Sequence, residues 1–214
     1  MENGRPGPSA RERRFGRTIN DLVTRAPWLW PLLRGSVRRL FDAKAHQWDE
    51  GRADSPDFLA PLATAVLEVS PKPERVLDVG CGTGIGTLFL VREFPQARVR
   101  GIDLSEEMVA AAKSKVGLDP EGRVAFKIAD AADLPYEEDS FDLVAQLNMP
   151  PFFAEVARVL RPGGHAIIAA SYGAATPFYT PPSVLERGFR KRGLEKVKDG
   201  EAGVGTYFVA RRPT

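Results

Sequence analysis

The chain has 214 residues, 43% of them hydrophobic and 27% charged, and this ordinary globular composition predicts one folded domain with an appendage. No apolar run approaches the roughly 20 residues of a membrane-spanning helix, and the short run at residues 28–33 lacks a signal-peptide cleavage pattern. The single cysteine, Cys81, excludes an internal disulfide, and two distant histidines give no metal-site spacing, so we expect a cytoplasmic protein without a metal.

Positive charge gathers at the start of the chain. Residues 1–40 hold nine arginines against three acidic residues, a net charge of +6, so the remaining residues carry −4 of the overall +2. Such a stretch either stays solvated or contacts an anionic partner, such as nucleic acid or lipid head groups. Because the first ten residues are rich in Gly and Pro, we predict that residues 1–25 form a disordered basic arm.

Two helices are predicted before the core. Between residues 29 and 41 apolar side chains recur at helical spacing, with Arg34, Arg38 and Arg39 between them, which indicates a basic amphipathic helix. A second helix is expected at residues 56–67, before a proline-containing break. We therefore predict a helical lid or substrate region over residues 26–70 and the core over residues 71–214.

From residue 75 onward, short apolar runs alternate with helix-length amphipathic stretches, which is the pattern of βαβ units. The predicted fold is α/β, a three-layer αβα sandwich around a mostly parallel seven-stranded sheet with a C-terminal antiparallel hairpin. That hairpin is expected to pair residues 194–197 with residues 206–210 across Asp199 and Gly200. The parallel strands are expected at residues 75–79, 99–103, 124–129, 141–147 and 165–170, and the helices at residues 85–94, 106–116, 150–160, starting at Pro150, and 183–192.

Polar and glycine residues stand at the predicted ends of successive strands. Asp78 leads into the glycine-rich residues 80–84, and Asp103, Asp130 and Asn148 end the next three strands. Carboxyl ends of parallel strands meet at one edge of a sheet, where ligands bind, so these groups are expected to share one cleft. A dinucleotide-binding GxGxxG pattern is excluded, because Ile85 stands where its last glycine belongs.

Five segments closely resemble the class I S-adenosylmethionine-dependent methyltransferases, in the same order and spacing. They are residues 76–84 (VLDVGCGTG), 101–105 (GIDLS), 128–131 (IADA), 140–142 (SFD) and 159–164 (VLRPGG). The resemblance implies a Rossmann-like fold that binds S-adenosyl-L-methionine and releases S-adenosyl-L-homocysteine. It implies that Asp78, Gly80, Cys81, Gly82 and Gly84 surround the methionine part, Asp103 binds both ribose hydroxyls, Asp130 and Ala131 contact adenine, and Leu147 or Asn148 contacts the ammonium group, with Leu104 and Met108 completing the set.

Each of these residues also has a purely structural interpretation. Asp103 can cap the following helix, and Asp130 can begin an Asx-type turn. Cys81 fits a tight glycine loop better than a nucleophilic role, since no histidine stands near it in the sequence.

The catalytic residues and the methyl acceptor are not evident from the sequence. Methyl transfer is an in-line displacement that positioning alone can accelerate. The candidates for a base or orienting group are His46, Asp49, Tyr172 and Tyr179, each of which can equally be a surface or packing residue.

Residues 148–152 (NMPPF) differ from a related motif in a way that bears on the acceptor. Amino-methylating nucleic-acid enzymes of this class place a polar residue directly before Pro-Pro, but here Met149 intervenes. We therefore interpret Pro150 as a helix start.

The leading hypothesis is a small-molecule methyltransferase whose acceptor lies between the N-terminal helices and the loop of residues 171–182. Residues 41–49 (FDAKAHQWD) resemble the segment before the core in small-molecule members, including quinone-biosynthesis methyltransferases. The helix over residues 28–41 then acts as a lid or as a peripheral membrane contact. The alternatives are an RNA, DNA or protein methyltransferase that uses the basic arm, and a non-catalytic binding module. No obligate partner is inferred.

Overall fold

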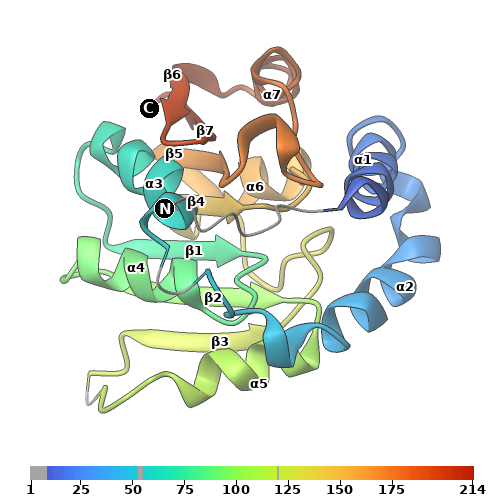
Figure 1. Ribbon diagram of the computed structural model, residues 1–214. Coiled ribbons are helices and arrows are strands. Elements are labelled where there is room, and N and C mark those ends of the chain that lie inside the picture. The colour runs from blue at the N-terminus through green and yellow to red at the C-terminus, as the bar shows by residue number, and fades with distance from the viewer. Residues whose placement is uncertain (1–8, 53–54, 120) are drawn as a thin grey trace.

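A seven-stranded sheet forms the centre of the protein in a computed structural model that describes residues 9–52, 55–119 and 121–214 (Figure 1). The strands are β1 (Arg75–Val79), β2 (Arg98–Asp103), β3 (Val124–Ile128), β4 (Phe141–Leu147), β5 (Leu160–Ala170), β6 (Glu195–Ala202) and β7 (Gly205–Arg211). The α-helices are α1 (Ala10–Arg25), α2 (Trp30–Asp42), α3 (Pro56–Ala65), α4 (Ile85–Glu93), α5 (Glu106–Ser114), α6 (Phe153–Val159) and α7 (Pro182–Arg190).

The strands lie in the order β3-β2-β1-β4-β5-β7-β6, and neighbouring strands are parallel except where β7 is involved. Helices cover both faces: α3 and α4 pack through Leu62 and Leu90 on one side, while α6 and α7 pack through Val156 and Phe189 on the other. The predicted three-layer α/β fold with its antiparallel hairpin is confirmed. Because both faces are covered, the central strands are apolar, and the strand ends are left for polar groups.

The N-terminal helices stand beyond the carboxyl ends of the central strands (Figure 1). The helix expected at residues 29–41 is confirmed by α2. The disordered arm predicted for residues 1–25 is wrong for α1, whereas residues 1–8 lie outside the described residues. Ser9 and Glu12 form a capping box, in which the Ser9 amide donates to Glu12 Oε2 at 2.8 Å, and the buried Ile19 and Val23 give the helix an apolar face. Among the described residues, no helix is long and apolar enough to cross a membrane.

Several boundaries in the C-terminal half differ from the sequence prediction. The helix expected from Pro150 begins at Phe153, because Pro151 directly follows Pro150 and a residue before proline disfavours helical backbone. That helix ends at Val159, and β5 begins at Leu160. The predicted turn at Asp199 and Gly200 is also wrong: both residues pair with β7, and the chain reverses between Ala202 and Gly205.

Gly16 sits where α1 meets the loop of residues 171–182, and its replacement should loosen that contact. A Cβ at Gly16 would lie 2.5 Å from Pro177 Cβ and 2.6 Å from the Pro177 backbone, so Gly16→Ala should cost about 1–3 kcal/mol of docking free energy through overpacking. Gly35 in α2 is the matched control, because a Cβ there meets nothing within 4 Å. Limited proteolysis at the arginines of α1 should be faster for Gly16→Ala and unchanged or slower for Gly35→Ala; equal rates would contradict the packing.

Candidate functional site

A cavity of about 110 Å³ lies at the carboxyl edge of the sheet, beneath the N-terminal helices. The ends of β1, β2 and β4 form its floor, and residues of α1, α2 and the loop of residues 171–182 close it from outside. Of the predicted cofactor-binding residues, ten line it together: Asp78, Gly80, Cys81, Gly82, Asp103, Leu104, Met108, Ala131, Leu147 and Asn148. Gly84 and Asp130 do not line the cavity.

The glycine loop after β1 is held in a backbone conformation that suits glycine. Gly80 and Gly82 have φ angles of +70° and +52°. The Cys81 amide donates to Ile102 O at 2.9 Å, which joins the loop to β2. A Cβ at Gly80 would overlap Met149 Sδ. Gly84, which directly precedes α4, faces Phe126 and lies outside the cavity. The loop thus brings backbone, without side chains, to the cavity surface.

Asp103 ends β2 and organises the loops on both sides of it. Its Oδ2 accepts from the Gly82 amide and its Oδ1 from the Ser105 amide, both at 2.9 Å. The residue that caps α5 is Ser105, whose hydroxyl accepts from the Met108 amide at 3.1 Å. Burial raises the pKa of Asp103, and these backbone N–H groups oppose the rise. Each carboxylate oxygen keeps a further lone pair, enough for two adjacent hydroxyl donors.

Asp78 is buried at the end of β1, where the Thr87 hydroxyl donates to its Oδ2 at 2.6 Å. Burial raises its pKa from 3.8 to about 7; the Thr87 hydrogen bond lowers it, and the negative charge of Asp103 raises it further. The Cys81 thiol lies beside them, and burial together with the two carboxylates raises its pKa well above the ordinary value. A thiol that stays protonated is a poor nucleophile, which supports the structural interpretation of Cys81.

The raised pKa of Asp78 predicts a pH-dependent cost to stability. Between the unfolded pKa near 3.8 and the folded pKa of about 7, the native state holds more protons than the unfolded state, so this group's contribution to stability falls as pH rises through that window. Asp78→Asn removes the effect and keeps an acceptor for Thr87. Urea unfolding should show the variant gaining roughly 4 kcal/mol on the wild type between about pH 4 and about pH 8. Parallel pH profiles would refute the assignment.

The end of β4 is tied to β5 through Asn148. Its Nδ2 donates to Ser171 Oγ, and its Oδ1 accepts from the Ser171 amide, both at 2.8 Å. Asn148 has a φ of +58°, and its neighbour Met149 turns back over Gly80, with Gln146 Nε2 3.5 Å from the Met149 sulfur. The Asn148 side-chain amide therefore has a structural role that does not depend on a ligand.

Asp130, predicted to contact adenine, faces the N-terminal helices instead. Its Oδ1 accepts from Trp30 Nε1 at 2.7 Å and from the Ala132 amide at 2.9 Å, and its Oδ2 pairs with Arg34 at 3.2 Å. The bond to Ala132, two residues on, is the Asx-type turn considered as the alternative. The contacts with Trp30 and Arg34 join Asp130 to α2, so this carboxylate fastens α2 to the core.

Aromatic side chains that the sequence analysis did not select form the outer wall. Trp30 packs edge-on against Phe152 with ring centroids 5.2 Å apart, and Phe41 lies 5.5 Å from Trp48 and 6.2 Å from Phe178. All five rings line the cavity. The helical spacing from residue 30 to residue 41 was a usable signal for the rings of α2. The acceptor was predicted to lie against the loop of residues 171–182, but Phe178 was not selected within that loop.

None of the four catalytic candidates lines the cavity. His46 is exposed, and Asp49 accepts from Thr83 Oγ1 at 2.5 Å and pairs with Lys115, so it fastens the segment before the core to the glycine loop. Tyr172 and Tyr179 are half-buried, and Arg17 lies over the Tyr179 ring. These positions favour structural roles for all four.

Comparisons with known proteins agree with this geometry. Residues 76–164 match a family described as "Methyltransferase domain". The O-methyltransferase cnsE of Penicillium expansum is 43% identical over 132 residues, which cover 56% of this chain and 48% of that protein. A fatty-acid O-methyltransferase of Mycolicibacterium smegmatis is 35% identical over 170 residues, covering 70% of this chain and 60% of that protein. The chain thus spans about half the length of these curated relatives.

A solved structure shows the same fold. A SAM-dependent methyltransferase from Aquifex aeolicus superposes with a TM-score of 0.64 over 79% of this chain and 97% of that one. At 20% sequence identity, the likeness concerns the fold alone.

Proposed function

We propose that this chain is a class I S-adenosylmethionine-dependent methyltransferase and that it transfers the methyl group of S-adenosylmethionine to a small-molecule nucleophile. One observation carries the proposal: the charged side chains that line the cavity are two carboxylates, Asp78 and Asp103, next to a glycine loop that exposes its backbone. Such a site suits a ligand that combines positive charge with a vicinal diol. S-adenosylmethionine has a sulfonium, an ammonium group and a ribose.

The donor is proposed to lie along the floor of the cavity. The two oxygens of Asp103 face the ribose hydroxyls, the backbone of the glycine loop lies along the methionine part, and Ala131 and Leu104 flank the adenine ring. Asp78 is proposed to face the ammonium group. A cation beside this carboxyl would lower the pKa of Asp78 again, so that the carboxyl loses its proton. S-adenosylmethionine itself supplies the electrophilic methyl group when bound.

The acceptor is proposed to enter between α1, α2 and the loop of residues 171–182. Arg17 and Asn20 of α1 donate to Tyr179 O of that loop at 2.9 and 3.3 Å, and Phe178 of the same loop reaches the cavity. The surrounding wall is aromatic and apolar, so the acceptor class that fits has an apolar body and one nucleophilic oxygen, nitrogen or carbon. The names of the relatives, an O-methyltransferase and a fatty-acid O-methyltransferase, support this choice.

The chain's own contribution to the reaction is positioning and exclusion of water. An in-line displacement on a methyl group needs the nucleophile held opposite the sulfur, and a closed aromatic wall can supply that alignment without a catalytic base. We accordingly assign residues 10–52, α1 included, as the region that encloses the acceptor. We assign α3 to the donor-binding core with residues 71–214, because it packs through Leu62 on a face of the sheet.

Calorimetry with S-adenosylhomocysteine tests the donor site, and a donor-consumption screen against phenols, amines, quinols and carboxylates tests the transfer. Binding together with turnover of one class is the expected result. Binding without turnover of any class, nucleic acids and proteins included, would favour the non-catalytic module. No binding would overturn the proposal.

A further inference from the structure

The helical lid has two faces of opposite character. Its inner face carries Trp30 and Val37, which are buried and line the cavity. Its outer face carries Trp28 in the short 3₁₀ turn η1 (Pro27–Leu29) and Leu32 in the first turn of α2, and these are 72% and 79% exposed. We call Trp28 and Leu32, with Arg25 and Arg39 at either end, the outer face of the lid. The outer pair takes no part in closing the cavity.

The apolar pair is four residues apart, across the junction of η1 and α2, and both side chains are mostly exposed. Large exposed apolar residues elsewhere, such as Leu67, Leu118 and Val204, belong to separate elements and are ordinary singly. An exposed tryptophan and an exposed leucine close together in one basic helical segment are different, because such a pair has the form of an interfacial anchor.

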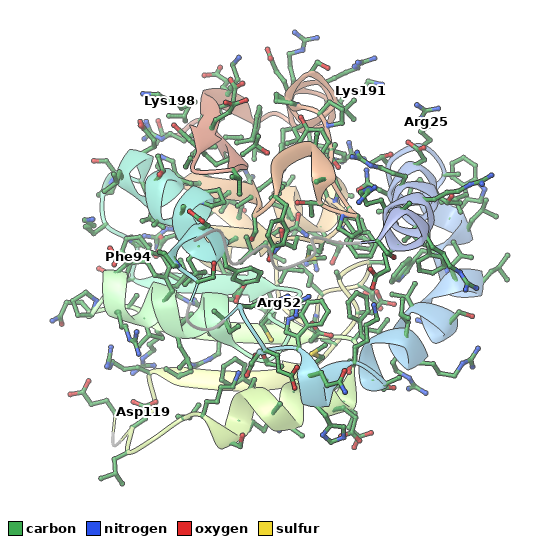
Figure 2. All side chains as sticks on the ribbon, in the orientation of Figure 1. Arg25, Arg52, Phe94, Asp119, Lys191 and Lys198 are labelled. Carbon is green, nitrogen blue, oxygen red and sulfur yellow. The ribbon has the colours of Figure 1, made fainter. Side chains whose placement is uncertain are left out.

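Positive charge surrounds this pair. Residues 10–42 carry eight arginines against three acidic residues, a net charge of +5. The side chain of Arg25 is 81% exposed and reaches Asp21 only at 3.9 Å, and Arg38 reaches Asp42 only at 3.9 Å. Figure 2 shows Arg25 at the outer end of α1, directed into solvent. Exposed pairs at this distance are weak, so the surface keeps most of its charge.

We propose that the outer face of the lid docks on the surface of an anionic phospholipid bilayer. Trp28 and Leu32 enter the head-group region, and Arg25 and Arg39 contact lipid phosphates. The consequence for the acceptor rests on the proposed function: a lid whose outer face meets lipid and whose inner face closes the cavity would receive an amphiphilic acceptor from the bilayer, without passage through water.

Vesicle co-sedimentation tests the docking. Vesicles of phosphatidylcholine mixed with an equal part of phosphatidylglycerol should retain the protein, and vesicles of phosphatidylcholine alone should retain much less. Trp28→Ser with Leu32→Ser should weaken binding about tenfold or more, and Arg25→Ala with Arg39→Ala by roughly fivefold for each charge. Leu67→Ser is the matched control, since Leu67 is 75% exposed but lies outside the basic region, and it should bind like the wild type.

Equal binding to both vesicle types, or wild-type binding by the Trp28→Ser/Leu32→Ser variant, would overturn the docking. Loss of binding with the arginine variant alone, together with tight salt-dependent binding of an RNA oligonucleotide, would assign the surface to nucleic acid instead. S-adenosylhomocysteine affinity, measured without vesicles, should be the same in all of these variants. Failure of the docking and failure of the proposed function are therefore separate results.

Discussion

Replacing Asp103 with alanine should weaken S-adenosylhomocysteine binding by about 100-fold or more. The variant lacks the carboxylate that is proposed to accept two charge-assisted hydrogen bonds from the ribose hydroxyls, each expected to contribute roughly 1.5–3 kcal/mol. It also frees the Gly82 and Ser105 amides, both of which donate to this carboxylate at 2.9 Å, so the glycine loop loses its support. Isothermal titration calorimetry gives the affinity directly.

Asp119→Ala is the matched control for Asp103→Ala. Asp119 also accepts from a backbone amide, that of Val124, at 2.8 Å, but it lies in the connection between α5 and β3, away from the cavity (Figure 2). Its replacement should leave S-adenosylhomocysteine affinity unchanged. If both variants bind like the wild type, Asp103 does not hold the ribose. If both lose binding equally, the effect is a general loss of folding.

The core was predictable because local patterns and long-range packing agree there. Strands such as β1 and β4 are short apolar runs that are buried on both faces, and the glycine loop with Asp78 and Asp103 stands at the ends of adjacent strands, where the topology brings them together. The roles of Asp130 and Asn148 were less predictable. Their partners, Trp30 and Ser171, are 100 and 23 residues away, and no spacing rule links such pairs.

The N-terminal region shows where composition misleads. The Gly- and Pro-rich start of the chain suggested a disordered arm up to residue 25, yet Ser9 with Glu12 is a capping box, and Ile19 and Val23 are spaced to bury one face. They are buried in a cluster with Trp30 and Val37 of α2 and with Phe152, and Phe178 of the loop of residues 171–182 packs against that cluster. When the packing partners of an apolar helix face are distant in the chain, the sequence alone does not distinguish that helix from a solvated arm. The structure was therefore needed to find α1.

Removing the Trp30 side chain should detach the lid from the core while leaving the core folded. Trp30 is buried, packs on Phe152, and donates to Asp130 Oδ1 at 2.7 Å, and replacing a buried aromatic residue by alanine costs about 3–5 kcal/mol. Trp30→Ala should therefore speed proteolysis at the α1 and α2 arginines by about 100-fold or more. Trp30→Phe keeps a ring but loses the hydrogen bond, which contributes roughly 1.5–3 kcal/mol when the acceptor is charged. This variant should speed proteolysis at the same arginines by about 10- to 100-fold.

Trp28→Ala is the matched control, because Trp28 lies two residues away on the outer face and does not line the cavity. This variant should be cleaved at the wild-type rate. Donor affinity separates the lid from the floor of the site. Trp30→Ala should weaken S-adenosylhomocysteine binding less than Asp103→Ala does, since the glycine loop and Asp103 remain in place. An equal loss of affinity would mean that the lid and the core bind the donor jointly. Asp130, which joins α2 to the core, would then couple closure of the lid to the proposed adenine end of the cavity.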